Sequence, residues 1–495
     1  MNVILPALYR IDEKENGNAV RQVSAPLWSG EATVEPFEKS RIRGFTITRA
    51  DGSPPVLLVT NTAQPSAEWT HAIKLRDVEF DHTTATTLDL SEGKWVKHPQ
   101  QLPKFSELAE YEGNVADVRE SWIDSFAYKR EDTERAIEGL RPPQLGSIYA
   151  VQAHWTVNAD AATVVLPTGV GKTETMLSLL VVERCERLLV VVPTDALRTQ
   201  ISEKFLLLGL LKTPRFRVVS DEARYPVVGT LNKRPVNTGQ VDSLFRKCNV
   251  IVTTMPLASQ CQPEVMQRMA ELCSCLFIDE AHHVAAPTWK GFKDAFEKNR
   301  IVQFTATPFR TDDQPIGGKR IFTFSLRHAQ EHGYFKEIHF KPVTEFDPAK
   351  KDAAIAEAAV EQLRADTALG HILMARVGSV ARAAEVFECY RGYTEFNPVQ
   401  IHTGITSKAE RDDIRKKLLS GQSRIAVCVD MLGEGFDLPE LKIAAFHDIR
   451  KTLAVTLQLV GRFTRAKPQL GNATFVANIA DLEVKDELKL SLIHI

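Results

Sequence analysis

The sequence predicts an α/β protein with two tandem lobes, each built on a parallel sheet, preceded by a smaller β-rich domain. From about residue 140, apolar runs of strand length alternate with segments of helical spacing, and the alternation continues in a second series from about residue 340. The residues before this region carry only short β-rich runs. We therefore expect a β-rich accessory domain, a helical linker, a first lobe, a second lobe and a short tail, at residues 1–115, 116–139, 140–340, 341–485 and 486–495.

Composition sets few limits on function. The 495 residues are 44% hydrophobic and 25% charged, with a formal net charge of −2, so any surface that binds nucleic acid must be local. No apolar run reaches the length of a membrane span, and the N-terminus lacks the pattern of a signal peptide. The seven cysteines are scattered without the paired C-x-x-C spacing of a zinc site. A reducing cytoplasmic location is expected.

The accessory domain contains a clear hairpin pattern. "GFTITRADGSPPVLLVT", residues 44–60, places two β-rich runs around an Asp-Gly pair and a Pro-Pro pair. The segments "AIKLRDVEFD" and "TTATTLDL" predict further short strands. No motif in this region predicts its role.

Five apolar runs predict a buried parallel sheet in the first lobe. They are "ATVVLPTG", "RLLVVVPT", "NVIVTTMP", "CLFIDEAHH" and "RIVQFTATP", which begin at residues 162, 187, 249, 275 and 300. Each run ends in polar residues or in a Gly/Pro cluster. Because ligands of such sheets gather at the carboxyl ends of the strands, we expect the site there.

The second lobe repeats this pattern. Strands are predicted at "HILMARV", "PVQIHTG", "RIAVCVD" and "KIAAFHDI", and helices at "VARAAEVFECYRGY", "SKAERDDIRKKLLSG" and "LAVTLQLVGRFTR". Ser407 and Glu410 form a capping-box pattern at the start of the second of these helices, and Gly421 follows its end. The segment "EFDPAKKD", residues 345–352, is predicted to link the two lobes.

A phosphate-binding loop follows the first strand of the first lobe. "LPTGVGKTE" carries Gly169, Gly171, Lys172 and Thr173 between a strand and a helix, which is the setting of a P-loop. The glycines let backbone N–H groups approach a phosphate, Lys172 would reach the β- and γ-phosphates, and the Thr173 hydroxyl would bind Mg²⁺. Leu166 departs from the pattern, which has a glycine at that position.

A pair of carboxylates follows another strand of the same sheet. In "LFIDEAHH", Asp279 is expected to bind Mg²⁺ and Glu280 to orient and deprotonate the attacking water. Two adjacent carboxylates at a buried strand end repel each other unless a cation lies between them. A zinc site formed by Glu280 with His282 and His283 is the alternative, but the H-E-x-x-H spacing is absent.

With these motifs, the chain resembles the superfamily 2 helicases and translocases, whose fold is a pair of RecA-like lobes. "LPTGVGKT" resembles motif I and "DEAH" motif II, and six further elements occur in the order of that family. They are "LRPPQ", "VVPTDALRTQ" with "VTTMP", "TATPFR", "IHTG", "VDMLGEGFDLP" and "QLVGRFTR". Within the superfamily, "DEAHH", "TATPFR" and "GEGFDLP" are most similar to the restriction-enzyme helicase group. The match to DEAD-box RNA helicases is poorer.

The resemblance implies roles for individual residues, with ATP and Mg²⁺ as cofactors. The implied ATP-binding residues are Gln144, Thr168, Gly169, Val170, Gly171, Lys172, Thr173, Glu174 and Asp437, with Thr173 and Asp279 on the metal. The implied catalytic residues are Lys172, Glu280, Arg462 and Arg465, and the implied nucleic-acid contacts are Thr194, Arg198, Thr254, Arg376 and Thr403. Val429 stands where many members of the family have threonine, which leaves the contact of motif V with nucleic acid in doubt.

The two arginines of "QLVGRFTR" predict how the lobes cooperate. Arg462 and Arg465 are three residues apart and would share one face of a helix. From the second lobe they can stabilise charge on a γ-phosphate held at Lys172, so that hydrolysis depends on closure of the lobes. A solvated basic face is the alternative for this pair.

For the whole protein we expect a DNA helicase or translocase, with DNA favoured over RNA as its partner and a nuclease or defence system as a further partner. An RNA-directed ATPase of the same fold and a nucleotide-dependent interaction module are the alternatives. The last residues, "LSLIHI", resemble translated sequencing-adaptor sequence, and we expect the chain to be truncated.

Overall fold

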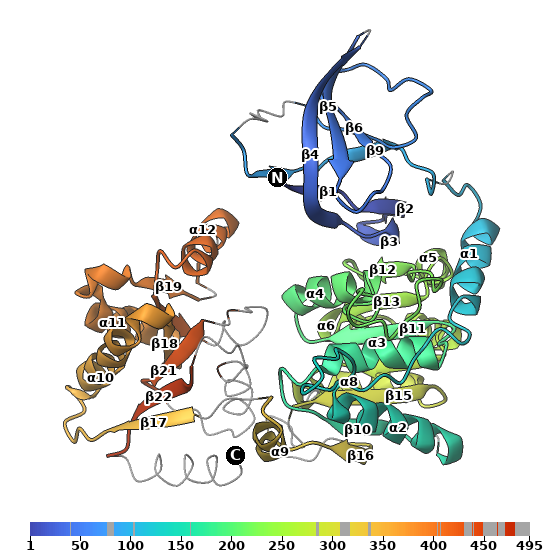
Figure 1. Cartoon of the computed structure of the whole chain (residues 1–495). Coiled ribbons are helices and arrows are strands. Elements are labelled where there is room, and N and C mark those ends of the chain that lie inside the picture. Colours follow the sequence, from blue (N-terminus) through green and yellow to red (C-terminus); the bar gives the residue numbers. More distant parts are fainter. Residues whose placement is uncertain are drawn as a thin grey trace.

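In the computed structural model, the described part of the chain forms three sheets, distributed as in Figure 1. It describes residues 1–39, 41–76, 84–101, 104–158, 160–283, 287–306, 317–334, 338–402, 404–405, 407–429, 438, 440–448, 463 and 471–480. The predicted fold class, two lobes with parallel sheets after a β-rich region, is confirmed. Among the described helices, none has the length and apolar character needed to cross a membrane.

The first sheet belongs to the N-terminal region and has the strand order β8-β1-β4-β5-β6-β7-β9. The strands are β1 (Asn2–Leu5), β4 (Trp28–Lys39), β5 (Ile42–Arg49), β6 (Val56–Val59), β7 (Ala72–Lys74), β8 (Thr87–Asp89) and β9 (Lys94–Lys97). The predicted hairpin is confirmed, since β5 and β6 pair antiparallel across the Asp-Gly and Pro-Pro turn. Ile47, Leu58 and Ile73 lie in the core of this sheet.

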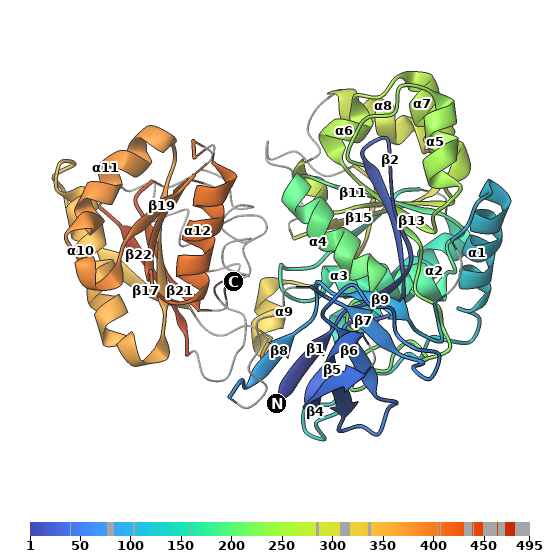
Figure 2. The same cartoon turned by 90° about the horizontal axis from the view of Figure 1, so that it is seen from above.

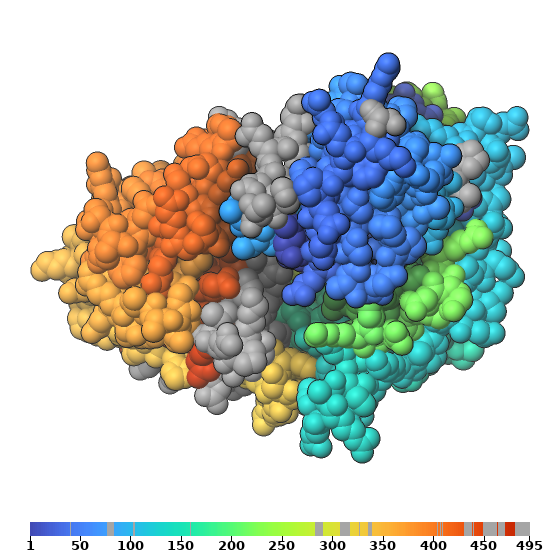
Figure 3. All heavy atoms as spheres, turned by 45° about the horizontal axis from the view of Figure 1, so that its top comes forward, coloured from blue at the N-terminus to red at the C-terminus, as the bar shows by residue number. Residues whose placement is uncertain are grey.

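Two N-terminal strands join the first lobe instead of the first sheet. β2 (Leu8–Glu15) and β3 (Asn18–Ala25) form a hairpin, and β3 pairs antiparallel with β12 (Val228–Thr230). Figure 2 shows β2 running alongside the strands of the first lobe, and Figure 3 shows the blue N-terminal region lying directly on the green part of that lobe. The prediction of one separate domain over residues 1–115 is therefore wrong for this hairpin.

The second sheet has the order β16-β10-β15-β14-β11-β13-β12-β3-β2, and neighbouring strands from β16 to β12 are parallel. Its other strands are β10 (Ala162–Val165), β11 (Leu188–Val192), β13 (Val250–Thr254), β14 (Cys275–Ile278), β15 (Arg300–Thr305) and β16 (Lys319–Thr323). Along β11, residues alternate between two core clusters, with Val190 in one and Val191 in the other. Both faces are therefore covered, which explains the continuous apolar runs.

Helices cover both faces of this sheet. They are α1 (Leu108–Glu120), α2 (Pro142–Val157), α3 (Lys172–Val182), α4 (Asp195–Leu206), α5 (Thr238–Phe245), α6 (Met255–Ser259), α7 (Pro263–Leu272), α8 (Pro287–Ala295) and α9 (Leu326–Glu331). The expected helical linker over residues 116–139 is wrong beyond Glu120, because residues 121–139 form turns and isolated bridges.

The third sheet forms the second lobe, with the order β17-β22-β21-β18-β20-β19 and parallel pairing throughout. Its elements are β17 (Ile338–Val343), α10 (Lys351–Ala365), β18 (Ile372–Val377), α11 (Val380–Arg391), β19 (Val399–Ile401), α12 (Lys408–Leu419), β20 (Ile425–Val429), β21 (Leu441–Phe446) and β22 (Ala473–Asn478). Ser407 caps α12 as predicted.

The second lobe begins with β17, which pairs with β22, so Ile338 already belongs to this lobe and lies close to the predicted boundary between residues 340 and 341. The segment 345–352, predicted to link the lobes, instead connects β17 to α10 and includes the first residues of that helix.

Candidate active site

The phosphate loop lies between β10 and α3, as predicted. Gly169 and Gly171 have φ values of +95° and +106°, a conformation that side chains with a Cβ rarely adopt. A Cβ on Gly171 would also lie 1.9 Å from the side-chain nitrogen of Gln144. Leu166, at the position of the missing glycine, is fully buried, and its N–H donates to the carbonyl oxygen of Thr305. That position therefore belongs to the core and not to the loop that faces a phosphate.

Lys172 and Glu280 form a buried ion pair that joins the phosphate loop to the acidic element. The distance from Lys172 Nζ to Glu280 Oε1 is 2.5 Å, and the side chains are 8% and 11% exposed. Glu280 adopts a left-handed backbone conformation, with φ +49°, and its N–H donates to Asp279 Oδ1 at 3.0 Å. The cation that the adjacent carboxylates were expected to need is therefore supplied within the chain by Lys172.

His282 connects the acidic element to the end of β15. Its Nδ1 lies 3.1 Å from Thr305 Oγ1 and 3.5 Å from Glu280 Oε2, and the ring is buried. Thr305 is the first residue of the "TATPFR" element. Sequence reasoning gave His282 only an unfavoured zinc role and missed this contact, although its place two residues after Glu280 was a usable signal.

Gln144 and Arg141 hold two carbonyl groups of the phosphate loop. Gln144 Nε2 donates to Gly171 O at 3.2 Å, and Gln144 Oε1 accepts from the Arg141 N–H at 2.7 Å. Arg141 Nη1 donates to Gly169 O at 2.9 Å. Both ends of the Gln144 amide are thus engaged at the loop, so an adenine contact of this residue stays a prediction.

The loop has the features that a triphosphate requires. Thr168 Oγ1 is buried and has no hydrogen-bond partner, which leaves a donor for a phosphate oxygen at the loop. Lys172 adds a cation and Asp279 a carboxylate. Thr173, which follows Lys172 in the chain, is partly exposed and adds a hydroxyl. Glu174, another predicted ATP-binding residue, forms an ion pair with Lys204 of α4 at 3.3 Å. The residues present therefore fit ATP with Mg²⁺.

The predicted nucleic-acid contacts have other surroundings in the structure. Thr194 caps α4 through its side chain, and Arg198 is buried with Nη1 3.4 Å from Leu231 O. Thr254 at the end of β13 and Arg376 in β18 are also buried. None of these four side chains forms an exposed basic surface in the structure.

Four predicted site residues lie outside the described residues. They are Thr403, Asp437, Arg462 and Arg465. Their roles stay predictions.

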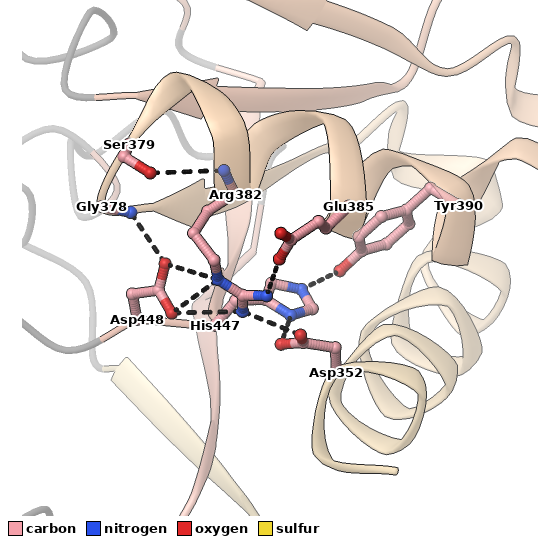
Figure 4. Close-up of polar contacts among 8 residues, drawn as sticks. All are labelled: Asp352, Gly378, Ser379, Arg382, Glu385, Tyr390, His447 and Asp448. Carbon is pink, nitrogen blue, oxygen red and sulfur yellow. Dashed lines mark hydrogen bonds and ion pairs between the residues drawn. The ribbon is translucent and has the colours of Figure 1, made fainter. Parts of the chain in front are cut away.

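The second lobe has a polar network at the carboxyl ends of β18 and β21 (Figure 4). Arg382 of α11 binds three carboxylates: Asp352 at 2.8 Å, Glu385 at 2.7 Å and Asp448 at 3.2 Å. Asp448 also accepts the N–H of Gly378 at 2.9 Å. The loop after β18 is therefore fixed to the loop after β21.

A buried histidine extends this network into the core. His447 Nδ1 lies 2.9 Å from Asp352 Oδ1, and its Nε2 lies 2.9 Å from the Tyr390 hydroxyl. Burial lowers the pKa of His447 and outweighs the opposite effect of Asp352. Burial raises the pKa of Asp352, but hydrogen bonds from His447 and Arg382 outweigh it and lower that pKa to about 2. Both pKa shifts are consistent with a neutral His447 imidazole that donates a hydrogen bond to an ionised Asp352 carboxylate.

Comparisons with known proteins identify the same two lobes. A family model described as "Type III restriction enzyme, res subunit" matches residues 137–310, and one described as "Helicase conserved C-terminal domain" matches residues 370–467. The chain is 33% identical over 117 residues to DEAD-box ATP-dependent RNA helicase 15 of Arabidopsis thaliana, which is 23% of this chain and 26% of that protein. It is 25% identical over 394 residues to an uncharacterised protein of Mycobacterium tuberculosis, with 67% of this chain and 60% of the relative covered.

A solved structure shows the same fold. A fragment described as an HsdR subunit of a type I restriction enzyme from Vibrio vulnificus YJ016 aligns with a TM-score of 0.51 at 15% identity, covering 97% of this chain and 89% of that fragment. The chain spans about a quarter of the length of the plant helicase and three-fifths of the mycobacterial protein.

The residues that the two family models match are those of the two lobes, and the phosphate loop and its acidic partner lie within the first matched range. In its first lobe the chain is similar to the Res subunit of type III restriction enzymes, and in its second lobe to the C-terminal domain of helicases.

Proposed function

We propose that this protein is a DNA-dependent ATPase that hydrolyses Mg-ATP between its lobes and moves along DNA. The observation that carries the proposal is the buried pair of Lys172 and Glu280, which joins the phosphate loop directly to the acidic element. A cation for phosphate and a base for water are thus in contact inside one site.

The positions of the side chains indicate how the residues of the first lobe act. Lys172 exchanges Glu280 for a phosphate oxygen, and the released Glu280 orients water and accepts its proton. Thr168 donates its hydroxyl hydrogen to a phosphate oxygen. Asp279 and Thr173 would hold Mg²⁺, which neutralises charge on the phosphates when bound. His282, between Glu280 and Thr305, passes a change at Glu280 to the end of β15.

The second lobe completes the site in this proposal. Arg462 and Arg465 stabilise the charge that develops during hydrolysis, and an arginine in this role contributes about 10³–10⁵ in rate. Their delivery from another lobe makes hydrolysis depend on closure. Repeated closure and opening change the distance between the contacts that the two lobes make with a nucleic-acid strand, and this change moves the protein along the strand. Contacts with the sugar–phosphate backbone make binding independent of sequence and sensitive to salt.

The similarity to the restriction-enzyme family model and to the type I restriction subunit supports DNA as the nucleic acid on which the protein acts. We propose a nuclease or a defence-system protein as a further partner. An RNA helicase is the second candidate, because the chain is 33% identical over 117 residues to a DEAD-box RNA helicase. Seven free cysteines support a reducing location, which we propose is the cytoplasm.

An ATPase assay with single-stranded DNA, duplex DNA and RNA in parallel tests the proposal. We expect DNA to stimulate turnover, and both Lys172→Ala and Arg465→Ala to abolish it. Arg391→Ala is the matched control, since this exposed arginine of the second lobe forms an ion pair with Glu388 of its own helix. Stimulation by RNA alone would select the second candidate. Stimulated turnover that survives either substitution would refute the mechanism, and nucleotide binding without any turnover would indicate an interaction module.

A further inference from the structure

Arg141 contacts three parts of the first lobe that are far apart in the sequence. Its Nη1 donates to Gly169 O of the phosphate loop at 2.9 Å. Its guanidinium carbon lies 4.9 Å from the centre of the Tyr334 ring, a cation–π distance. Its Nε lies 4.0 Å from Glu131 Oε2. One side chain therefore touches both the phosphate loop and the end of the lobe.

Tyr334 is anchored in the first lobe. Its N–H donates to Ala329 O near the end of α9, and the centre of its ring lies 6.4 Å from that of Phe324, which follows β16. Its hydroxyl donates to Glu131 Oε1 at 2.5 Å, so the carboxylate of Glu131 faces both the hydroxyl and Arg141. Burial and this hydrogen bond raise the pKa of Tyr334, which keeps the hydroxyl protonated as a donor.

Tyr334 also lies next to the crossing between the lobes. Only residues 335–337 separate it in sequence from Ile338, the first residue of β17. β17 belongs to the sheet of the second lobe. Any change in the position of Tyr334 is therefore a change at the point where the chain leaves the first lobe.

We propose that Glu131, Arg141 and Tyr334 couple the phosphate loop to the crossing between the lobes, so that a polyphosphate in the loop repositions the second lobe. This inference rests on the proposed function and assigns it three positioning residues. The Gly169 carbonyl belongs to the loop whose N–H groups would bind a phosphate, so a change in the loop backbone on binding would reach this carbonyl. Arg141 is bonded to that carbonyl, and it passes the change to the ring of Tyr334.

The test measures the distance between the lobes by fluorescence energy transfer. Val157 of α2 and Phe346, which follows β17, are 79% and 80% exposed, so Val157→Cys and Phe346→Cys provide labelling positions on the two lobes. The background carries Cys389→Ser, because the other six cysteines are buried. A non-hydrolysable ATP analogue with Mg²⁺ is the probe, and its affinity and the melting temperature are measured for each variant.

Tyr334→Ala is expected to lower the change in transfer on analogue binding by at least about half, with analogue affinity within about twofold of the parent. Tyr334→Phe keeps the ring and is expected to recover most of the change. Arg141→Ala should remove the change and weaken analogue binding about tenfold, because it also loses the loop carbonyl. The double substitution of Arg141 and Tyr334 should be no worse than Arg141→Ala alone.

A matched control separates coupling from a general loss of packing. Arg364 lies 5.4 Å from the Tyr393 ring in the second lobe, so Tyr393→Ala removes the same kind of contact elsewhere. It should leave the response intact. An unaltered response in Tyr334→Ala, or no response in the parent chain, would overturn the inference. The readout requires binding but not turnover, so a parent chain without ATPase activity would refute the proposed function while this test stays decisive.

Discussion

Loss of Lys172 is expected to destabilise the first lobe as well as to block hydrolysis. The ion pair with Glu280 is 2.5 Å long and its side chains are about nine-tenths buried. Removing one member of a buried pair leaves an uncompensated charge, at a cost of ~3–5 kcal/mol. His282 lies 3.5 Å from Glu280 Oε2 and offers a substitute partner, which places the expected cost near the lower limit. Since 1 kcal/mol corresponds to ~2–4 °C in domains of this size class, Lys172→Ala should melt on the order of 10 °C lower.

Thermal unfolding without added nucleotide measures this effect. The double variant of Lys172→Ala with Glu280→Gln removes both charges and should regain most of the loss, with a coupling energy of at least ~2 kcal/mol in the double-mutant cycle. Lys204→Ala is the matched control, because the pair of Lys204 with Glu174 is 3.3 Å long and the lysine is 40% exposed. That control should cost less than ~1 kcal/mol. A Lys172→Ala variant as stable as the control, or a double variant less stable than both single ones, would refute this reasoning.

Three further predictions concern backbone strain, a charge network and pH. Glu280 has φ +49°, so Glu280→Gly should be about 1 kcal/mol more stable than Glu280→Ala in urea unfolding, and equal stability would argue against strain. Arg382→Ala breaks contacts with three carboxylates and should lower the free energy of unfolding in urea by ~2–3 kcal/mol. The exposed Arg391→Ala should lower it by at most ~0.5 kcal/mol. Similar losses in the two variants would contradict the role of the network. The pKa of Asp352 is lowered from 3.8 to about 2, so the unfolded chain binds this proton more readily. The stabilisation is complete above about pH 4 and falls by up to about 2 kcal/mol as pH drops toward 2. Asp352→Asn should therefore reduce the dependence of folding stability on pH between about pH 4 and pH 2. An unchanged pH dependence in this variant would contradict the role of Asp352.

The sheet of the first lobe was readable from the sequence because burial on both faces requires continuous apolar runs. The runs before Pro167, Pro193 and Asp279 coincide with β10, β11 and β14. β12 escaped prediction because its three residues "VGT" carry no periodicity. The hairpin of β2 and β3, which pairs with β12, had a signal in the sequence, because the pair Asn16-Gly17 stands between two alternating runs. In the structure both of these residues have positive φ values. That pair predicts a turn, but nothing local predicts which sheet the hairpin joins.

The residue types of the candidate site were also readable, whereas their contacts were not. Lys172 and Glu280 are 108 residues apart, and only the fold brings them together. The role of Arg141 depends in the same way on the position of Tyr334, which no motif includes. For the predicted nucleic-acid contacts, the residue type alone was not specific enough. A threonine after a strand, such as Thr194, is equally suited to cap a helix.

The Lys172–Glu280 pair also determines how the site can discriminate between water and substrate. While Lys172 holds Glu280 at 2.5 Å, the carboxylate already has a cationic partner, and in the proposed mechanism it is not yet free to accept a proton from water. In the proposed mechanism, a polyphosphate in the loop offers Lys172 another anionic partner and so releases Glu280 at the place where the base is needed. The affinity of the loop for nucleotide is then the difference between two interactions of one lysine. In the proposed mechanism Glu280 would become active as a base only when nucleotide is bound, which would link hydrolysis to occupancy before any contribution from the second lobe.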